Sequence, residues 1–545
     1  MADKLDPHHM VALMNYVFRG KQDRSSQSLD PSSFNAELGN TNKRGTSAHT
    51  FHILDAIASI CAFKKGSKAV AVALQLDPKN QKIRLTIAGN QEVESCLVDH
   101  LERVWGNLQA LSNELSTESE SDKNEEASPD VSQDMSCMLM LKIFRELYQL
   151  TMEKQRRREA KWLGDLGSFA NKLAKRRIGV LQGSARDVCE ILTGLEMARE
   201  VVDKVYHCPS YVLTEDEWLE VYGFNIWFIE KAELVLEGEN NLDCESLAQE
   251  LNGMPLSLFG KWVMISDLQA NFTSVLDSPL CPEKAFRLRH ALEKLTSLAR
   301  HIQYLISLTA SHRFRHVLQY HMSISTVPGQ TRTVELPESQ DQWKPFLEIA
   351  AGRKFRWQEV DAVKLARYFK KNILVCPAHC ECVLAQYLTA KHSDTWDNIP
   401  AFSYIGTSKL TCSACSIWLE AFNEVGQRTF YTQGSDGKWY WPWGMPQGGE
   451  SLTETMARVS LEKTAPRKSL EESMAAKISS EYIRHLNRQG LYIPDSNSRY
   501  TSWSSERQHL SDARMQVISS KLAAYMQKFS DNTELHSDSI PSHPW

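Results

Sequence analysis

Two short stretches of the 545-residue chain carry residue types that bind metal: Pro377-Ala378-His379-Cys380-Glu381-Cys382 and Cys412-Ser413-Ala414-Cys415. A histidine and two thiolates hold Zn²⁺ in many enzymes and leave its fourth position for water. A glutamate two residues after the histidine does not bind the metal and is placed to move protons. The pair of stretches therefore predicts a catalytic zinc site, with His379, Cys412 and Cys415 as ligands and Glu381 as the proton shuttle.

The surroundings of the two stretches favour this interpretation. A short apolar run at 373–375 precedes the first stretch, and a strand-like run at 401–407 precedes the second. Each stretch also begins a helix-like run. A β-α-β-α arrangement of this kind brings both helix starts to the carboxyl edge of one sheet. Cys412 and Cys415 are one helical turn apart, so their thiols face the same point.

Other interpretations of the same residues stay open at this stage. Redox pairs and structural zinc sites also contain Cys-x-x-Cys, so that motif alone is weak evidence. Cys376, Cys380 and Cys382 lie close to His379 in the sequence, which makes a closed, cysteine-rich structural zinc site an alternative. A third interpretation is a chance coincidence of buried cysteine and histidine side chains.

The composition is that of an ordinary globular protein, with 42% hydrophobic residues, 24% charged residues and a net charge of −5. No apolar run approaches the roughly 18 residues that cross a bilayer, and the first ten residues lack a signal-peptide pattern. We therefore expect an intracellular protein, cytoplasmic or nuclear, that has no membrane partner. The twelve cysteines are then expected to be reduced, buried or metal-bound. The oligomeric state does not follow from the sequence.

Changes in composition divide the chain into seven segments. They are a polar N-terminal segment (1–46), a helix, β-hairpin and helix (47–112), an acidic disordered linker (113–134), an α-helical region (135–315), a strand/helix connector (316–369), the zinc-site core (370–450), and C-terminal helices with a disordered tail (451–545). The linker is acidic and rich in serine, so it buries too little apolar surface to order itself. Breaks at glycine and proline divide the helical region into six predicted helices, at 136–178, 184–206, 214–236, 242–252, 256–278 and 283–312.

One helical segment is strongly basic. Between Lys154 and Arg177 the chain has nine lysine and arginine residues and two acidic residues. Such a strip is typical of a surface that contacts nucleic acid. It also fits a solvated helix face, which we favour because the acidic linker lies just upstream and can neutralise it.

The motif residues also resemble a known family. His379-Cys380-Glu381 with Cys412-Ser413-Ala414-Cys415 resembles the cytidine-deaminase-like superfamily. The run Tyr404-Ile405-Gly406-Thr407-Ser408-Lys409-Leu410-Thr411-Cys412 and the later Trp439-Tyr440-Trp441-Pro442 are more closely similar to the OTT-like deaminases, which occur as fungal intracellular proteins and bacterial toxin domains. The resemblance covers residues 370–450. The sequence departs from the family pattern at two positions. Cys380 replaces the usual alanine. Thr411 replaces a proline that would preset the start of the helix, and the threonine side chain can cap the helix instead.

This resemblance implies both a fold and an activity. The fold would be a three-layer α/β/α domain with a mixed sheet, joined here to a large all-α region. The activity would be zinc-dependent hydrolytic deamination of a nucleobase in a nucleoside, nucleotide or nucleic acid, with zinc-bound water as nucleophile and Glu381 as proton shuttle. The alternative from another class is a non-catalytic deaminase-fold scaffold or interaction protein with a structural zinc.

The superfamily fold also requires a β-hairpin before the His-x-Glu helix. Residues 69–88 and 316–336 are the two candidates, and we favour the first because its strands are more apolar. It ends in Gly89-Asn90, like the superfamily strand whose asparagine touches the substrate sugar. That choice makes residues 96–370 a helical insertion. It also predicts Asn90 as a substrate contact, and we assign Ser408, Trp439 and Trp441 to the same role, although aromatic clusters more often form sheet core.

Overall fold

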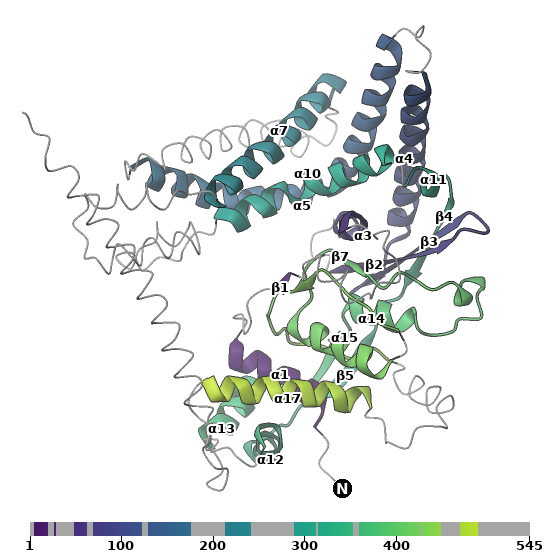
Figure 1. Ribbon diagram of the computed structural model, residues 1–545. Coiled ribbons are helices and arrows are strands. Elements are labelled where there is room, and N and C mark those ends of the chain that lie inside the picture. The colour runs from purple at the N-terminus through teal and green to yellow at the C-terminus, as the bar shows by residue number, and fades with distance from the viewer. Residues whose placement is uncertain are drawn as a thin grey trace, which may run out of the picture.

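The structure is a computed structural model. It describes residues 5–19, 27–28, 48–62, 69–121, 129–175, 213–240, 288–311, 314–352, 359–426, 428–447 and 469–488. In Figure 1 a β-sheet occupies the middle of the molecule, with one group of helices above it and another below. The sheet and the helices that cover its two faces position the candidate site.

The central sheet has four strands in the order β4-β3-β2-β7. Its strands are β2 (Val70–Asp77), β3 (Lys82–Gly89), β4 (His321–Val327) and β7 (Gly406–Thr407). The hairpin β2–β3 is antiparallel, β4 runs parallel to β3, and β7 runs antiparallel to β2. The sheet is therefore mixed. The favoured hairpin lies at its centre, while the other candidate segment supplies the edge strand β4.

Helices cover both faces of this sheet, and β2 and β3 are therefore buried on both sides. Ala71 and Ala73 point to the face that carries α14 (Cys380–Tyr387) and α15 (Ser413–Val425). Their neighbours Val70 and Val72 point to the opposite face, which carries α3 (Ala48–Cys61) and α4 (Ser95–Ser121). Successive strand residues alternate between faces. The result is the three-layer α/β/α domain that the sequence predicts.

A second, two-stranded sheet leads into the metal motif. β5 (Thr331–Glu335) pairs antiparallel with β6 (Ile373–Pro377), and Thr331 lies opposite Pro377. Four helices share a core with α14 and α15: α1 (Pro7–Phe18), α12 (Gln340–Ala351), α13 (Glu359–Tyr368) and α17 (Leu470–Arg488). They form the lower helical group in Figure 1. Two further short strands, β1 (Gln27–Ser28) and β8 (Gly434–Ser435), pair with each other.

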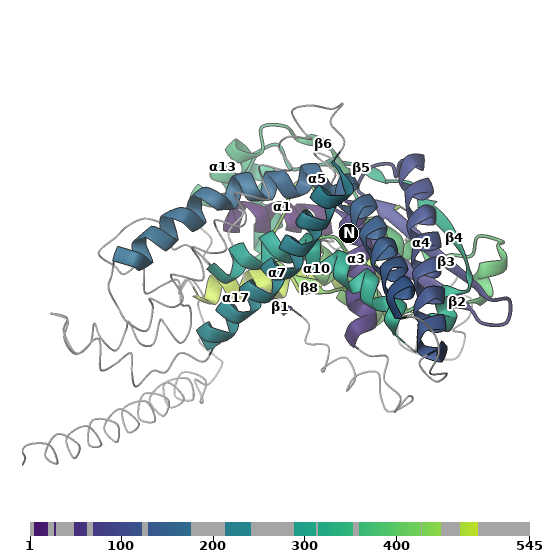
Figure 2. The same ribbon diagram turned by 90° about the horizontal axis from the view of Figure 1, so that it is seen from above.

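The upper helical group is built on α3 and α4. It comprises α5 (Pro129–Lys175), α7 (Glu215–Asn240) and α10 (Leu288–Ala310), which lie side by side when seen from above in Figure 2. The short helix α11 (Arg315–Leu318) then returns the chain to β4. Near this return, the Gln319 side chain donates a hydrogen bond to Asn113 Oδ1 on α4 over 2.7 Å. The helical region therefore leaves and rejoins the sheet layer at neighbouring points.

The structure corrects four details of the sequence-based expectations. The linker expected to be disordered at 113–134 is helical over most of its length, because α4 continues to Ser121 and α5 begins at Pro129. The predicted insertion at 96–370 ends earlier, because β4 belongs to the central sheet. The strand expected from His316 begins only at His321, after α11. The strand-like run at 401–407 forms only the two-residue strand β7 and isolated bridges, one of them between Tyr404 and Tyr431.

Several expectations fall outside the described residues. They are the helices predicted at 184–206, 242–252 and 256–278, and the C-terminal tail beyond residue 488. Within the described residues, no helix is long and apolar enough to cross a bilayer.

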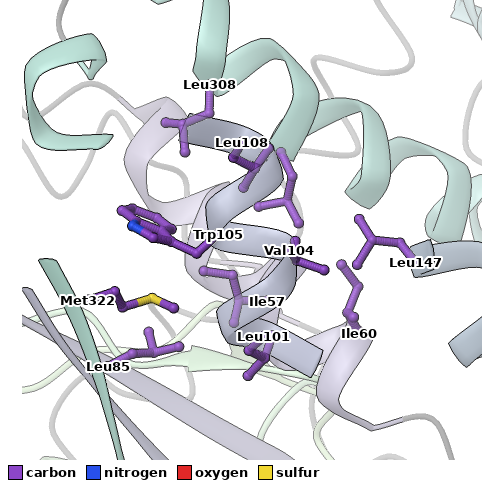
Figure 3. Close-up of a pocket in the computed structure, with 11 residues that line it drawn as sticks. Ile57, Ile60, Leu85, Leu101, Val104, Trp105, Leu108, Leu147, Leu308 and Met322 are labelled. Carbon is purple, nitrogen blue, oxygen red and sulfur yellow. The ribbon is translucent and has the colours of Figure 1, made fainter. Parts of the chain in front are cut away.

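A small cavity of about 30 Å³ lies where the sheet, α3, α4 and the helical region meet. Figure 3 shows its lining, which includes Ile57, Leu101 and Met322 and is apolar apart from the indole N–H of Trp105, which donates a hydrogen bond to Tyr320 O. A space of this size and polarity is a gap in core packing. It offers no polar group that could bind or convert a substrate.

Candidate metal centre

His379, Cys412 and Cys415 converge as the sequence predicts. The Nδ1 atom of His379 lies 3.2 Å from Cys415 Sγ and 3.6 Å from Cys412 Sγ, and the two sulfur atoms are 3.3 Å apart. Zinc bonds of about 2.0 Å to nitrogen and 2.3 Å to sulfur place tetrahedral ligand atoms about 3.5 to 3.8 Å apart. Both the donor types and their spacing therefore fit a metal ion such as zinc. In the described part of the chain, these three residues form the candidate metal group.

The two helix starts explain why these side chains meet. His379 is the N-cap residue of α14, and Cys412 is the N-cap residue of α15. His379 follows shortly after the end of β6. Ala378, which lies between them, is held in place by a bridge with Gly444. A side chain at Gly444 would put a Cβ atom 2.6 Å from Cys376 O, so the close approach of these segments requires glycine.

Burial sets the protonation of the two cysteines of the centre. Cys412 and Cys415 are 3% and 0% exposed, and burial raises the pKa of both thiols well above the usual value. Each thiol also hydrogen-bonds to a neighbouring cysteine. A metal ion reverses this balance, because it stabilises the thiolates directly.

Glu381 lies in the first turn of α14 beside these ligands. Its side chain is buried, and its Oε2 accepts a hydrogen bond from Cys380 Sγ over 3.3 Å. Asp436 approaches from the segment after α15, and Tyr440 donates a hydrogen bond to Asp436 Oδ2 over 2.8 Å. Burial raises the pKa of Asp436, and the negative charge of Glu381 contributes to that rise. Sequence reasoning missed Asp436, since residues 434–437 carry only the signal of a turn.

The structure brings Asn90 to the centre from far back in the chain. Asn90 Oδ1 accepts a hydrogen bond from the backbone N–H of Cys380 over 2.8 Å, although the two residues are 290 positions apart. This N–H belongs to the first turn of α14 and has no partner within the helix. Asn90 therefore caps α14 and lies beside His379 and Glu381.

The other three predicted substrate contacts occupy different positions. Ser408 Oγ accepts a hydrogen bond from Val70 N over 2.9 Å, which ties the end of β7 to β2. Trp439 is completely buried in the core, and Trp441 is half-buried against Phe369. Their role in substrate binding stays a prediction.

A different tryptophan contacts the metal group. Trp443 is completely buried, and its indole Nε1 donates a hydrogen bond to Cys415 Sγ over 3.2 Å. Hydrogen bonds of this kind orient a metal ligand and modulate its charge. The Trp-rich composition of 439–443 is the only sequence signal for this contact, and it does not identify which ring makes it.

The mixed sheet, the two helix starts and the His/Cys/Cys group with a glutamate beside it together define a deaminase domain. Residues 378–447 match the family model of the OTT_1508-like deaminases, and this part of the chain is a domain of that family. Searches of curated proteins and of solved structures gave no match.

Proposed function

We propose that the protein is a zinc-dependent hydrolytic deaminase that acts on a nucleobase of a nucleoside, nucleotide or nucleic acid. The observation that carries the proposal is the position of the buried Glu381 carboxylate beside the converging side chains of His379, Cys412 and Cys415. The family match at 378–447 supports hydrolytic deamination in general. When bound, zinc supplies Lewis acidity and lowers the pKa of a coordinated water towards about 7.

The remaining steps of the reaction are assigned to residues of the chain. His379, Cys412 and Cys415 hold the metal. Glu381 takes a proton from water as water adds to the carbon that carries the exocyclic amine, and it passes that proton to the amine, which leaves as ammonia. Its burial within α14 keeps the carboxylate at a fixed place. Asn90 fixes the start of α14 through Cys380 N, and its amide group is positioned to contact the substrate.

Metal analysis combined with an ammonia-release assay tests this proposal. Purified protein should contain about one zinc per chain, because the described residues form one ligand group. The substrates assayed are nucleosides, nucleoside monophosphates, single-stranded DNA and single-stranded RNA. Glu381→Gln should keep the zinc and lower the rate by about 10²- to 10⁴-fold, since it removes the proton shuttle.

Glu420→Gln is the matched control, because Glu420 lies exposed on α15. This variant should keep both the zinc content and the rate. If the zinc-loaded wild-type protein releases no ammonia from any of these substrates, the protein is a non-catalytic scaffold and the proposal is wrong.

A further inference from the structure

The described cations at the start of the basic segment of α5 differ in the partners that they contact. Lys154 is half-buried, and its Nζ donates a hydrogen bond to Ser59 O at the end of α3 over 2.7 Å. One turn later, Arg158 donates a hydrogen bond to Ser297 Oγ on α10 over 2.6 Å. The exposed Arg157 instead lies beside Glu153 on α5 itself. Lys154 and Arg158 therefore point towards α3 and α10.

Two cations from other segments join this pair. Lys294 lies exposed on α10, one turn before the Ser297 that Arg158 contacts. Lys409 lies exposed in the segment that follows β7. Burial first, and then the charges of Arg158, Lys409 and Lys294, lower the pKa of Lys154 to about 7. The contacts of Lys154 with Ser59 and of Arg158 with Ser297 place these two cations on the side of α5 that faces α3 and α10, where Lys294 also lies.

Carboxylates do not balance this charge in the described structure. None of the four cations forms an ion pair with a described residue. The exposed Glu293 raises the pKa of the adjacent Lys294 but lies outside ion-pairing distance. Crowding and partial burial of like charges cost folding free energy. Such an arrangement is typical of sites that bind an anion.

One of the four cations, Lys409, lies at the sheet edge that leads to the metal centre, whereas the other three lie on α5 and α10, beyond α3. Lys409 follows Ser408, whose backbone N–H donates a hydrogen bond to Val70 O over 2.9 Å. Val70 is paired with Gly89 at the end of β3, and the next residue, Asn90, contacts Cys380. Lys154 approaches this edge at the end of α3, just before the chain enters β2. Contacts through β2 and β3 thus lead from the neighbourhood of Lys409 to Asn90, while Lys154 contacts the α3 side of the sheet.

We propose that Lys154, Arg158, Lys294 and Lys409 form a binding site for a phosphate group of the substrate. The inference rests on the proposed function and extends it, because Lys409 lies at the sheet edge that also carries Asn90, the residue that contacts the start of α14. A phosphate supplies negative charge and acceptor oxygens, which match ammonium and guanidinium donors. The phosphate belongs either to a nucleotide or to a single nucleic-acid strand. The helical region then has a defined role in substrate recognition.

Equilibrium binding to the full-length protein tests this site without requiring turnover. The probes are inorganic pyrophosphate, measured by calorimetry, and a labelled single-stranded oligonucleotide, measured by fluorescence anisotropy. The double variant Lys294→Glu/Lys409→Glu changes two exposed side chains and should weaken binding by about tenfold or more. For the oligonucleotide, the slope of log K against log salt should also fall by about 1.4, equivalent to two lost contacts.

Lys370→Glu/Lys371→Glu is the matched control, because both lysines are exposed and lie between α13 and β6. It should bind both probes like the wild type. Pyrophosphate binding alone indicates a nucleotide as the source of the phosphate, whereas much tighter oligonucleotide binding indicates a nucleic-acid strand. The phosphate site is overturned if the wild type binds neither probe, or if both double variants bind equally well.

Both assays are repeated with Glu381→Gln, which separates this site from the proposed chemistry. Probe binding that survives in this variant, together with absent ammonia release from the wild type, keeps the phosphate site and rejects only the deaminase activity. Ammonia release from a nucleoside with no probe binding keeps the deaminase activity and rejects only the phosphate site.

Discussion

The indole Nε1 of Trp443 lies 3.2 Å from the Sγ of Cys415 and donates a hydrogen bond to it. Trp443 is completely buried, so no water can replace this donor if the indole is removed. The contact therefore links the aromatic segment after α15 to the strength of metal binding.

Trp443→Phe should weaken zinc binding by about 10- to 100-fold, the usual effect of losing a hydrogen bond to a metal ligand. Competition with a chromophoric zinc chelator measures this affinity. Trp441→Phe is the control, because the Trp441 ring packs edge-on against Phe369. Equal zinc affinity in the two variants would show that the indole N–H does not act on Cys415.

Asn90 offers a way to separate capping from substrate contact. Asn90→Ala removes the acceptor for Cys380 N and should cost about 1 kcal/mol of stability, as the loss of a helix cap usually does. Asn90→Asp keeps an acceptor oxygen and should retain most of that stability, but it loses the amide N–H donors. We expect it to raise KM in the ammonia assay. If Asn90→Asp has the wild-type KM, the amide does not contact the substrate.

Gly406 sets the distance between β7 and α3. A Cβ atom at this position would lie 2.5 Å from the carbonyl oxygen of Leu54, in backbone that cannot rotate away. Gly406→Ala should therefore destabilise the protein by more than about 2 kcal/mol, as overpacking does. Gly329→Ala is the control, since its new Cβ would meet its nearest neighbour at an ordinary 3.5 Å. Urea unfolding of the two variants gives the comparison, and equal midpoints would contradict it.

Asp55 should make stability depend on pH between about 4 and 7. Burial raises the pKa of Asp55 to about 7, while hydrogen bonds from Tyr404 and Thr407 N oppose that rise. The folded protein therefore holds a proton that the unfolded chain releases near pH 4. This contribution is fully present below pH 4 and is lost as the pH rises towards 7, on the order of 4 kcal/mol in total.

The test compares urea unfolding of the wild type and Asp55→Asn at several pH values in that window. Asn keeps an oxygen acceptor for Thr407 N, and its neutral amide does not titrate. The variant should lose less stability than the wild type between pH 4 and 7. Parallel curves for the two proteins would show that Asp55 is already ionised in the folded state.

The sequence determines the ligands of the centre more fully than its surroundings. Motif spacing alone places His379, Cys412 and Cys415 together, because each half-motif begins a helix after a strand. Hairpin chemistry and apolar alternation likewise identify β2 and β3. The position of Asn90 near Cys380 can be predicted only from the family resemblance, since 290 residues separate the two.

Other features depend on tertiary packing and leave little trace in local sequence. Asp436 reaches the centre because the turn at 434–437 folds over the start of α15, where Asp436 N bonds to Thr411 O. Lys154 turns inward only because α3 ends beside α5. For the acidic linker, the local sequence predicts too little structure. Its composition suggests disorder, yet most of it continues α4 or begins α5.

The hydrogen bond between Gln319 and Asn113 joins two points that lie 206 residues apart in sequence and 2.7 Å apart in space. The crossover from β3 to the parallel strand β4 is already complete in α4 and α11, so the intervening helices add nothing to its connectivity. Closing the chain at this point needs only a short turn. The helical region is thus an insertion between two neighbouring points of the fold, and it shares a core with α3 and α4. A loop that joined Asn113 to Gln319 would therefore leave the crossover from β3 to β4 intact, but it would expose the apolar side chains of α3 and α4 that α5 and α10 cover.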